Sequence, residues 1–207
     1  MILRVNATRM ELLKLRRRLE IAQRGHKLLK DKQDELMRHF LDLIAQNRDL
    51  RRDVEAKLLK AHSAFLMARA VMDRASLEAA IMFPKQKLSI EVSAEQVMNL
   101  RVPRFSLSSE GDVYAYGFLS TSGELDSALQ LYSEVLPEMI RLAEMERALQ
   151  LLAEEIERTR RRVNALEYVL IPNLQDTIAY IRMRLDEMER SNTTRLMKIK
   201  EMIAQGR

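Results

Sequence analysis

The stretch from Leu12 to Asn47 reads "LLKLRRRLEIAQRGHKLLKDKQDELMRHFLDLIAQN", and its apolar residues recur every three or four positions. This spacing predicts a helix that packs along one seam, as in a coiled coil. The a positions of the heptads are Leu12, Leu19, His26, Gln33, Phe40, Asn47 and Val54, and the d positions are Leu15, Ala22, Leu29, Leu36, Leu43 and Leu50. Every d residue is apolar, whereas three a residues are polar.

This helix is expected to begin near Thr8 and to end before Pro84. Thr8 and Glu11 have the spacing of a capping box, in which each side chain bonds the backbone of the other residue. After Val54 the seam shifts by one residue and continues through Leu58, Ala61, Phe65, Ala68, Met72, Ala75, Ala79 and Met82. A single helix over residues 8–82 would be about 110 Å long.

Residues 84–122 change character. "KLSIEV" alternates in polarity, "LRVPRF" and "VYAYGFL" contain β-favouring residues, and "SSEGD" has the composition of a turn. These signals predict a short β-hairpin or a small irregular head.

A second helical segment follows this insert. Thr121 and Glu124 offer another capping box, and Pro137 is expected to interrupt or kink a short helix. The seam then continues through Leu142, Met145, Leu149, Leu152, Ile156, Thr159, Val163, Leu166, Leu170, Leu174, Ile178, Ile181, Leu185, Met188, Asn192, Leu196, Ile199 and Ile203. Pro172 lies off this seam, where its register shifts and a bend is cheapest.

The predicted fold class is mainly α. Two long helices that flank a compact insert imply an antiparallel two-helix coiled coil, with the β-containing insert at the end opposite the termini. We expect an N-terminal helix over residues 1–83, the insert over residues 84–122 and the C-terminal helices over residues 123–207.

The composition agrees with long helices. The chain has 207 residues, 5 glycines, 4 prolines and no tryptophan, and 31% of its residues are charged. It contains no cysteine, and it lacks both a membrane-spanning apolar run and the pattern of a signal peptide. These features predict a soluble, cytoplasmic protein without direct membrane insertion.

The net charge of +5 is spread unevenly. Residues 1–32 hold ten Lys/Arg and three Asp/Glu, and residues 193–207 hold four and one, so these ends sum to +10 and the remainder to −5. If both ends lie together, they form a basic pole.

No catalytic constellation is evident. His26, His39 and His62 are scattered along one expected helix and are expected to be solvated or seam residues. We therefore predict no catalytic residue, no metal site and no cofactor. The run Arg158–Arg162 is either a phosphate-binding stripe, with Arg48, Arg51 and Arg52 at a similar height, or a solvated face paired with nearby glutamates. The lack of interleaved aromatic residues favours the second interpretation and argues against a nucleic-acid partner.

Gly25 is unexpected inside this helix, because a mid-helix glycine costs about 1 kcal/mol relative to alanine. It occupies a g position beside His26, where it lets another backbone approach closely; the alternative is a tolerated flaw. With Gln33 and Asn47, the pair Gly25 and His26 predicts a seam that fixes one register at some cost in stability.

Two long motifs stand out: "VNATRMELLKLRRRLEIAQRGHKLLKDKQDELMR" at Val5–Arg38 and "EEIERTRRRVNALEYVLIPNLQDTIAYIRMRLDEMER" at Glu154–Arg190. With the chain length and the insert, they resemble the D subunit of the V-type rotary ATPases, including the archaeal and bacterial A-type enzymes. Ala7 and Gln33 are small departures from that pattern, where proline and arginine are common.

The resemblance implies a central rotor shaft that performs no chemistry itself. Nucleotide hydrolysis or synthesis occurs in a hexameric ring of A and B subunits and is coupled to proton or sodium transport. The shaft also binds the small F subunit and a membrane-side socket subunit. Candidate ring-contact residues at the pole are Arg9, Met10, Leu13, Arg17, Lys198 and Met202. Candidate docking-head residues are Ile90, Val92, Val102, Phe105, Tyr114, Tyr116 and Phe118. The alternatives are a free-standing coiled-coil scaffold and a basic coiled coil that binds nucleic acid.

Overall fold

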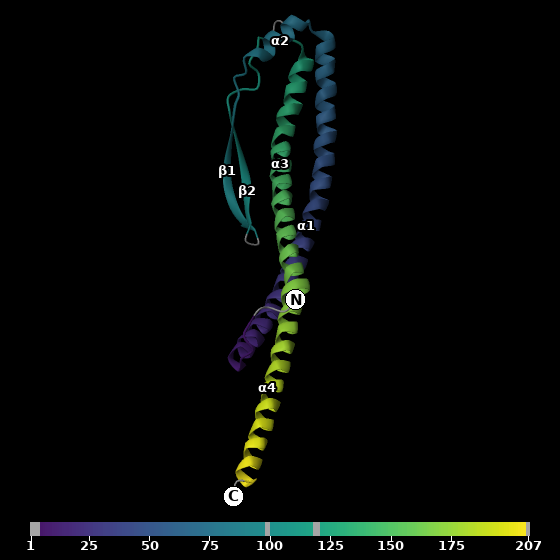
Figure 1. Ribbon diagram of the computed structural model, residues 1–207. Coiled ribbons are helices and arrows are strands. Elements are labelled where there is room, and N and C mark those ends of the chain that lie inside the picture. Colours follow the sequence, from purple (N-terminus) through teal and green to yellow (C-terminus); the bar gives the residue numbers. More distant parts are fainter. Residues whose placement is uncertain (1–4, 98–99, 118–120, 206–207) are drawn as a thin grey trace. The chain divides into compact units, whose positions relative to one another are not determined.

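The computed structural model describes residues 5–97, 100–117 and 121–205. Its elements are α1 (Arg9–Val71), α2 (Arg74–Met82), β1 (Lys87–Val97), β2 (Leu100–Glu110), α3 (Gly123–Asn164), the π-helix η1 (Ala165–Leu170) and α4 (Ile171–Gln205) (Figure 1). The chain forms two compact units. We call residues 1–35 and 156–207 the terminal unit and residues 36–155 the hairpin unit.

In the terminal unit the first part of α1 packs antiparallel to η1 and α4. Arg9 pairs with Glu189, and further along α1 His26 meets Glu167, so partner numbers fall as α1 proceeds. The buried core consists of Leu15, Ala22, Leu174 and Ile181. The predicted seam residues Leu12, Leu19, Leu166, Leu170, Ile178 and Leu185 pack against that core. The heptad prediction is therefore confirmed here as far as Leu185.

Beyond Leu185 the helix α4 continues without burying its seam. Every residue of α4 from Asp186 to Ala204 is exposed, including the predicted seam residues Met188, Leu196, Ile199 and Ile203. The capping of α1 agrees with the prediction in one respect, because the Glu11 amide donates to Thr8 Oγ1 at 3.2 Å.

The register change expected near Pro172 takes the form of a π-helix. In η1 the Ile171 amide bonds the carbonyl of Leu166, five residues back instead of four. Pro172 has no amide hydrogen to offer the carbonyl of Tyr168, so the wider turn immediately before it accommodates the missing bond. This extra residue in one turn changes the phase of the apolar seam.

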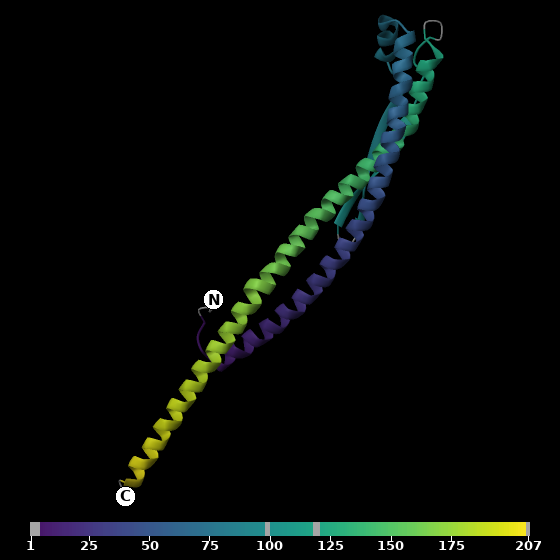
Figure 2. The same ribbon diagram turned by 90° about the vertical axis from the view of Figure 1, so that its right-hand side faces the viewer.

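In the hairpin unit α1 and α3 lie side by side and antiparallel (Figures 1 and 2). Their buried side chains include Leu36, Val54, Ala61 and Leu152, all on the predicted seams, and Val135, for which no seam was predicted. A second cluster of Ala68, Leu77 and Leu125 lies where α2 joins the two helices.

The expectation of one helix over residues 8–82 is wrong. The first helix ends at Val71. Asp73 then caps α2 by accepting a hydrogen bond from the Ala75 amide at 3.3 Å. The new helix has its own phase, so Leu77 is buried, whereas Ala75, Ala79 and Met82 of the predicted seam are exposed. An aspartate that bonds its own backbone competes with helix continuation, and alanine-rich seams do little to oppose that competition.

The start and the continuity of α3 also differ from expectation. Thr121 donates its hydroxyl to the Gly117 carbonyl, and the helix begins at Gly123, so Thr121 does not act as the expected cap. Pro137 lies inside α3 and does not interrupt it. Because Pro137 is exposed while Val135 is buried against α1, tertiary packing outweighs the loss of one helical hydrogen bond.

The insert contains one antiparallel hairpin, in which Lys87 pairs with Glu110 and Val97 with Leu100. The two strands therefore meet at the pair Val97 and Leu100, and "SSEGD", expected to form a turn, instead contains the end of β2. "VYAYGFL" forms no strand in its described part, residues 113–117. Gly111 follows β2 with φ of +98°, and a Cβ there would lie 2.5 Å from the carbonyl oxygen of Lys85. Only glycine fits this position without strain.

Candidate interaction surfaces

One face of the hairpin is apolar, and its β1 side is exposed. Side chains alternate along a strand, and paired residues on antiparallel strands point to the same side. Leu88, Ile90 and Val92 therefore share a face with Leu107 and Phe105. Ile90 is 53% and Val92 67% exposed, an uncommon arrangement for the central residues of an apolar strand face. This outer face of the hairpin is a candidate interaction surface.

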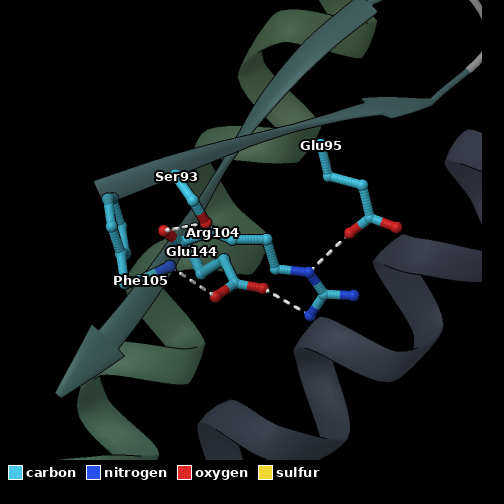
Figure 3. Close-up of polar contacts among 5 residues, drawn as sticks. All are labelled: Ser93, Glu95, Arg104, Phe105 and Glu144. Carbon is cyan, nitrogen blue, oxygen red and sulfur yellow. Dashed lines mark hydrogen bonds and ion pairs between the residues drawn. The ribbon is translucent and has the colours of Figure 1, made fainter. Parts of the chain in front are cut away.

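The opposite face is polar over most of its length, with Val97 and Val102 near the end of the hairpin, and it is attached to α3 through Arg104 (Figure 3). Arg104 Nε donates to Glu95 Oε2 at 2.6 Å, and Arg104 Nη1 donates to Glu144 Oε1 at 2.9 Å. The Phe105 amide donates to the other oxygen of Glu144 at 3.0 Å. The hydrogen bond from Arg104 to Glu95 and the negative charges of Glu95 and Glu144 raise the pKa of Arg104. The guanidinium therefore stays charged in this contact.

A cavity of about 270 Å³ lies between the hairpin, α1 and α3. Its apolar lining comes from both sides: Val97 and Val102 from the hairpin, and Leu43, Met145, Ala148 and Leu152 from the helices. His39, Gln46, Arg104, Arg141 and the carboxylates of Glu95 and Glu144 supply its polar lining.

The predicted docking-head residues fall into different environments. Ile90 and Val92 are exposed, Phe105 is half-buried, and Val102 is buried on the cavity side. Tyr114 and Tyr116 meet edge to face, with ring centroids 6.4 Å apart. Tyr116 donates its hydroxyl to Asp126 Oδ1 at 2.6 Å, and burial together with Asp126 raises the pKa of Tyr116. Phe118 lies outside the described residues.

The predicted ring-contact residues all belong to the terminal unit. Arg9 forms its ion pair with Glu189, while Met10, Leu13, Arg17, Lys198 and Met202 are exposed. Both basic ends of the chain belong to this same unit. It thus combines a positive charge with exposed apolar side chains on α4.

The four predicted register residues also differ in their surroundings. His26 Nε2 lies 3.4 Å from Glu167 Oε2, which η1 carries. Gln33 is half-buried. A Cβ added to Gly25 would meet no atom within 4 Å, so no described neighbour in this chain requires glycine there. Asn47 Oδ1 is buried without a hydrogen-bond partner among the described residues.

Several polar contacts between α1 and α3 were not expected from the sequence. Lys57 pairs with Glu138, His62 Nδ1 is hydrogen-bonded to the Tyr132 hydroxyl, and Arg51 lies 3.6 Å from Glu146. A positional signal exists for two of these residues, because Lys57 lies beside Leu58 and Glu146 beside Met145 of the predicted seams. Choosing the partners requires the helix register, which the heptads leave ambiguous.

In the arginine run at Arg158–Arg162, Arg161 pairs with Glu157 of its own helix. Arg48, expected at the same height, lies in the hairpin unit with its side chain 3.8 Å from Asp49. Within residues 5–97, 100–117 and 121–205, no helix is long and apolar enough to cross a bilayer. The same residues contain no cluster of three or more potential metal ligands.

Comparisons with known proteins give one consistent result. A family model described as the D subunit of ATP synthase matches residues 11–201. The D subunit of the V-type ATP synthase of Acetivibrio thermocellus is 61% identical over 206 residues, covering 98% of this chain and 93% of that protein. Its counterpart in Thermoanaerobacter pseudethanolicus is 55% identical over 207 residues, 99% of each chain. That of Clostridium novyi is 52% identical over 206 residues, 97% of this chain and 95% of that protein.

Proposed function

The chain belongs to the D-subunit family of ATP synthases, and from this premise we propose that it is the non-catalytic central shaft of a rotary V/A-type ATPase. The shaft couples ATP hydrolysis or synthesis in a ring of A and B subunits to proton or sodium transport. It works at the cytoplasmic face of the membrane, in the peripheral sector of the complex.

The observation that carries this proposal is the exposed apolar stripe on α4. Leu196, Ile199 and Ile203 recur at the spacing of a seam, yet all are exposed. A helix with such a stripe is suited to apolar contact with another protein. We assign this stripe, with the basic residues around it, to the interior of the A/B ring.

The hairpin unit is proposed to dock the small F subunit or the membrane-side socket subunit. Its support is the exposed apolar face of the hairpin, centred on Ile90 and Val92. The paired variant Ile90→Ser and Val92→Ser should weaken binding of one of these two partners by at least tenfold, measured by calorimetry. Ser106→Ala on the opposite face is the matched control. Unchanged binding of both partners would contradict the docking role.

Rotation is tested by a reversible cross-link, because the chain contains no cysteine. One cysteine replaces exposed Lys198, and a second is placed on the facing inner wall of one catalytic subunit. If the shaft turns, the disulfide stops sustained ATP turnover and a reductant restores it.

A cross-link at Arg161, away from the pole, provides the control against local swivelling of the end of α4. The same result is expected there. Full turnover with this second disulfide closed would overturn the shaft proposal, since a static scaffold tolerates such a bond.

A further inference from the structure

We propose that the hairpin is a hinged flap, held over the groove between α1 and α3 by the carboxylate of Glu144. Opening the flap would uncover the apolar side chains of that groove. The proposal concerns the free chain and does not depend on the shaft function.

Glu144 is suited to the role because it uses both oxygens. One accepts from the Arg104 side chain and the other from the Phe105 backbone amide, so one residue of α3 holds a side chain and the edge of β2 together. The Glu144 side chain is only 17% exposed, whereas that of Arg104 is 59% exposed. Hydrogen bonds to a charged group in such a partly buried place are stronger than those between neutral groups.

The attachment of the hairpin is concentrated on β2, because β1 is almost entirely exposed. Every residue of β1 except Val97 is exposed. In β2 only Val102 is fully buried, while Leu100, Pro103, Phe105 and Leu107 are half-buried. A two-stranded sheet is at best marginally stable by itself. The hairpin is therefore held mainly through β2, by Val102 and the half-buried residues of that strand, with Val97 over the cavity and the polar contacts of Glu144 at its edge.

The contact between the hairpin and the helices differs from a packed core, because it encloses a cavity. With about 270 Å³ between the strands and the helices, closing the flap buries fewer contacts than a filled interface would. Opening exposes Leu43, Met145 and Leu152 on the helices. It also frees the edge of β2, whose amides become available to another strand.

The test is hydrogen exchange on the full-length chain, comparing Glu144→Ala with Glu95→Ala. Both variants remove one carboxylate that contacts Arg104, but only Glu144 connects the hairpin to α3. Alanine favours helix, so α3 itself is not weakened. We expect exchange of the Phe105 amide and its β2 neighbours to rise by about tenfold or more in Glu144→Ala, and by less than about twofold in Glu95→Ala. If the Phe105 amide exchanges equally fast in wild type and in Glu144→Ala, or if exchange rises equally in both variants, Glu144 does not hold the flap and the proposal is overturned.

Spin labels distinguish a swinging flap from a melted hairpin. Cysteines at Leu88 and Ser109, which pair across the strands, report hairpin integrity. Cysteines at Ser109 and at exposed Arg147 of α3 report attachment. In Glu144→Ala the first distance should stay narrow while the second broadens. Broadening of both would mean that the hairpin unfolds in place, which would reject the flap.

Discussion

The two units hold their helices together by different means. The terminal unit relies on an apolar cluster around Leu15 and Leu174, with the contacts of Arg9 and His26 at its margin. The hairpin unit adds polar contacts between α1 and α3 at three heights, through Arg51, Lys57 and His62. An apolar seam tolerates a slip of one heptad, whereas specific polar pairs do not. We expect the hairpin unit to contribute most to the register, because polar contacts occur at three heights along its helices, and the terminal unit to keep an exposed apolar surface on α4.

The largest expected effect comes from truncating one buried leucine in the core of each unit. Leu152→Ala in the hairpin unit and Leu174→Ala in the terminal unit both remove fully buried side chains. Each should lower the free energy of unfolding by about 2–5 kcal/mol, measured by urea denaturation. Exposed Leu196→Ala should change it by less than about 0.5 kcal/mol. If Leu174→Ala behaves like Leu196→Ala, the terminal unit has no core of its own in the free chain.

The next largest effect is expected from replacing one glycine of each unit by alanine. Gly111→Ala in the hairpin unit places a Cβ against the Lys85 carbonyl at positive φ, and should cost about 1–3 kcal/mol of stability. Gly25→Ala meets no atom within 4 Å and should gain up to about 1 kcal/mol. Thermal unfolding of both variants checks the opposite signs.

Gly25→Leu extends this comparison to the assembled complex. A Cβ at this position meets no atom within 4 Å in the free chain, and we expect the melting temperature of this variant not to fall. A loss of assembly with the A/B ring would assign Gly25 to close approach by another protein of the complex. Full assembly and full ATP turnover would support the alternative, a tolerated flaw.

A smaller effect is expected at the polar seam residues. Asn47→Leu removes a buried oxygen that lacks a partner in the described part of the chain, and should stabilise the hairpin unit by about 1 kcal/mol. His26→Leu removes a contact to Glu167 and should give no such gain. Denaturant titrations give both values, and a gain from His26→Leu equal to that from Asn47→Leu would contradict the difference between the units.

The smallest effects are those of single ion pairs. In double-mutant cycles, Lys57 and Glu138, which are 48% and 31% exposed, should couple by about 0.5–1 kcal/mol. Arg9 and Glu189 are 78% and 58% exposed, and should couple by less than about 0.5 kcal/mol. Raising the salt concentration should reduce the second coupling more than the first. Equal couplings would weaken the assignment of register to the hairpin unit.

The apolar spacing in the sequence predicted the paired helices well, because a strict seam leaves few other ways to bury leucines such as Leu36 and Leu152. The same spacing gave a wrong prediction where the helix could be rotated to more than one position and still bury apolar residues. Ala75 and Ala79 fit a continued seam, yet Asp73 restarts the helix and Leu77 becomes the buried residue. The expected interruption at Pro137 is also absent, because α3 continues through that residue.

The hairpin was predicted from alternation, but its turn and its orientation were not. Alternation identifies two faces without saying which one meets the helices, and here the polar face with Arg104 does so (Figure 3). Glu144 could not be singled out, because its partners lie about forty residues away on a segment whose docking the seam pattern does not describe.

The π-helix η1 has a geometric consequence for the helix that follows it. One residue of an α-helix corresponds to about 100° of rotation around the axis, so the wide turn at Ala165–Leu170 sets the azimuth of every later side chain. Deleting one residue there would rotate Leu196, Ile199 and Ile203 together by about 100° around the helix axis, although none of these three residues is itself changed. The direction that the apolar stripe of α4 faces is thus set by the π-helix, some twenty-five residues before the stripe.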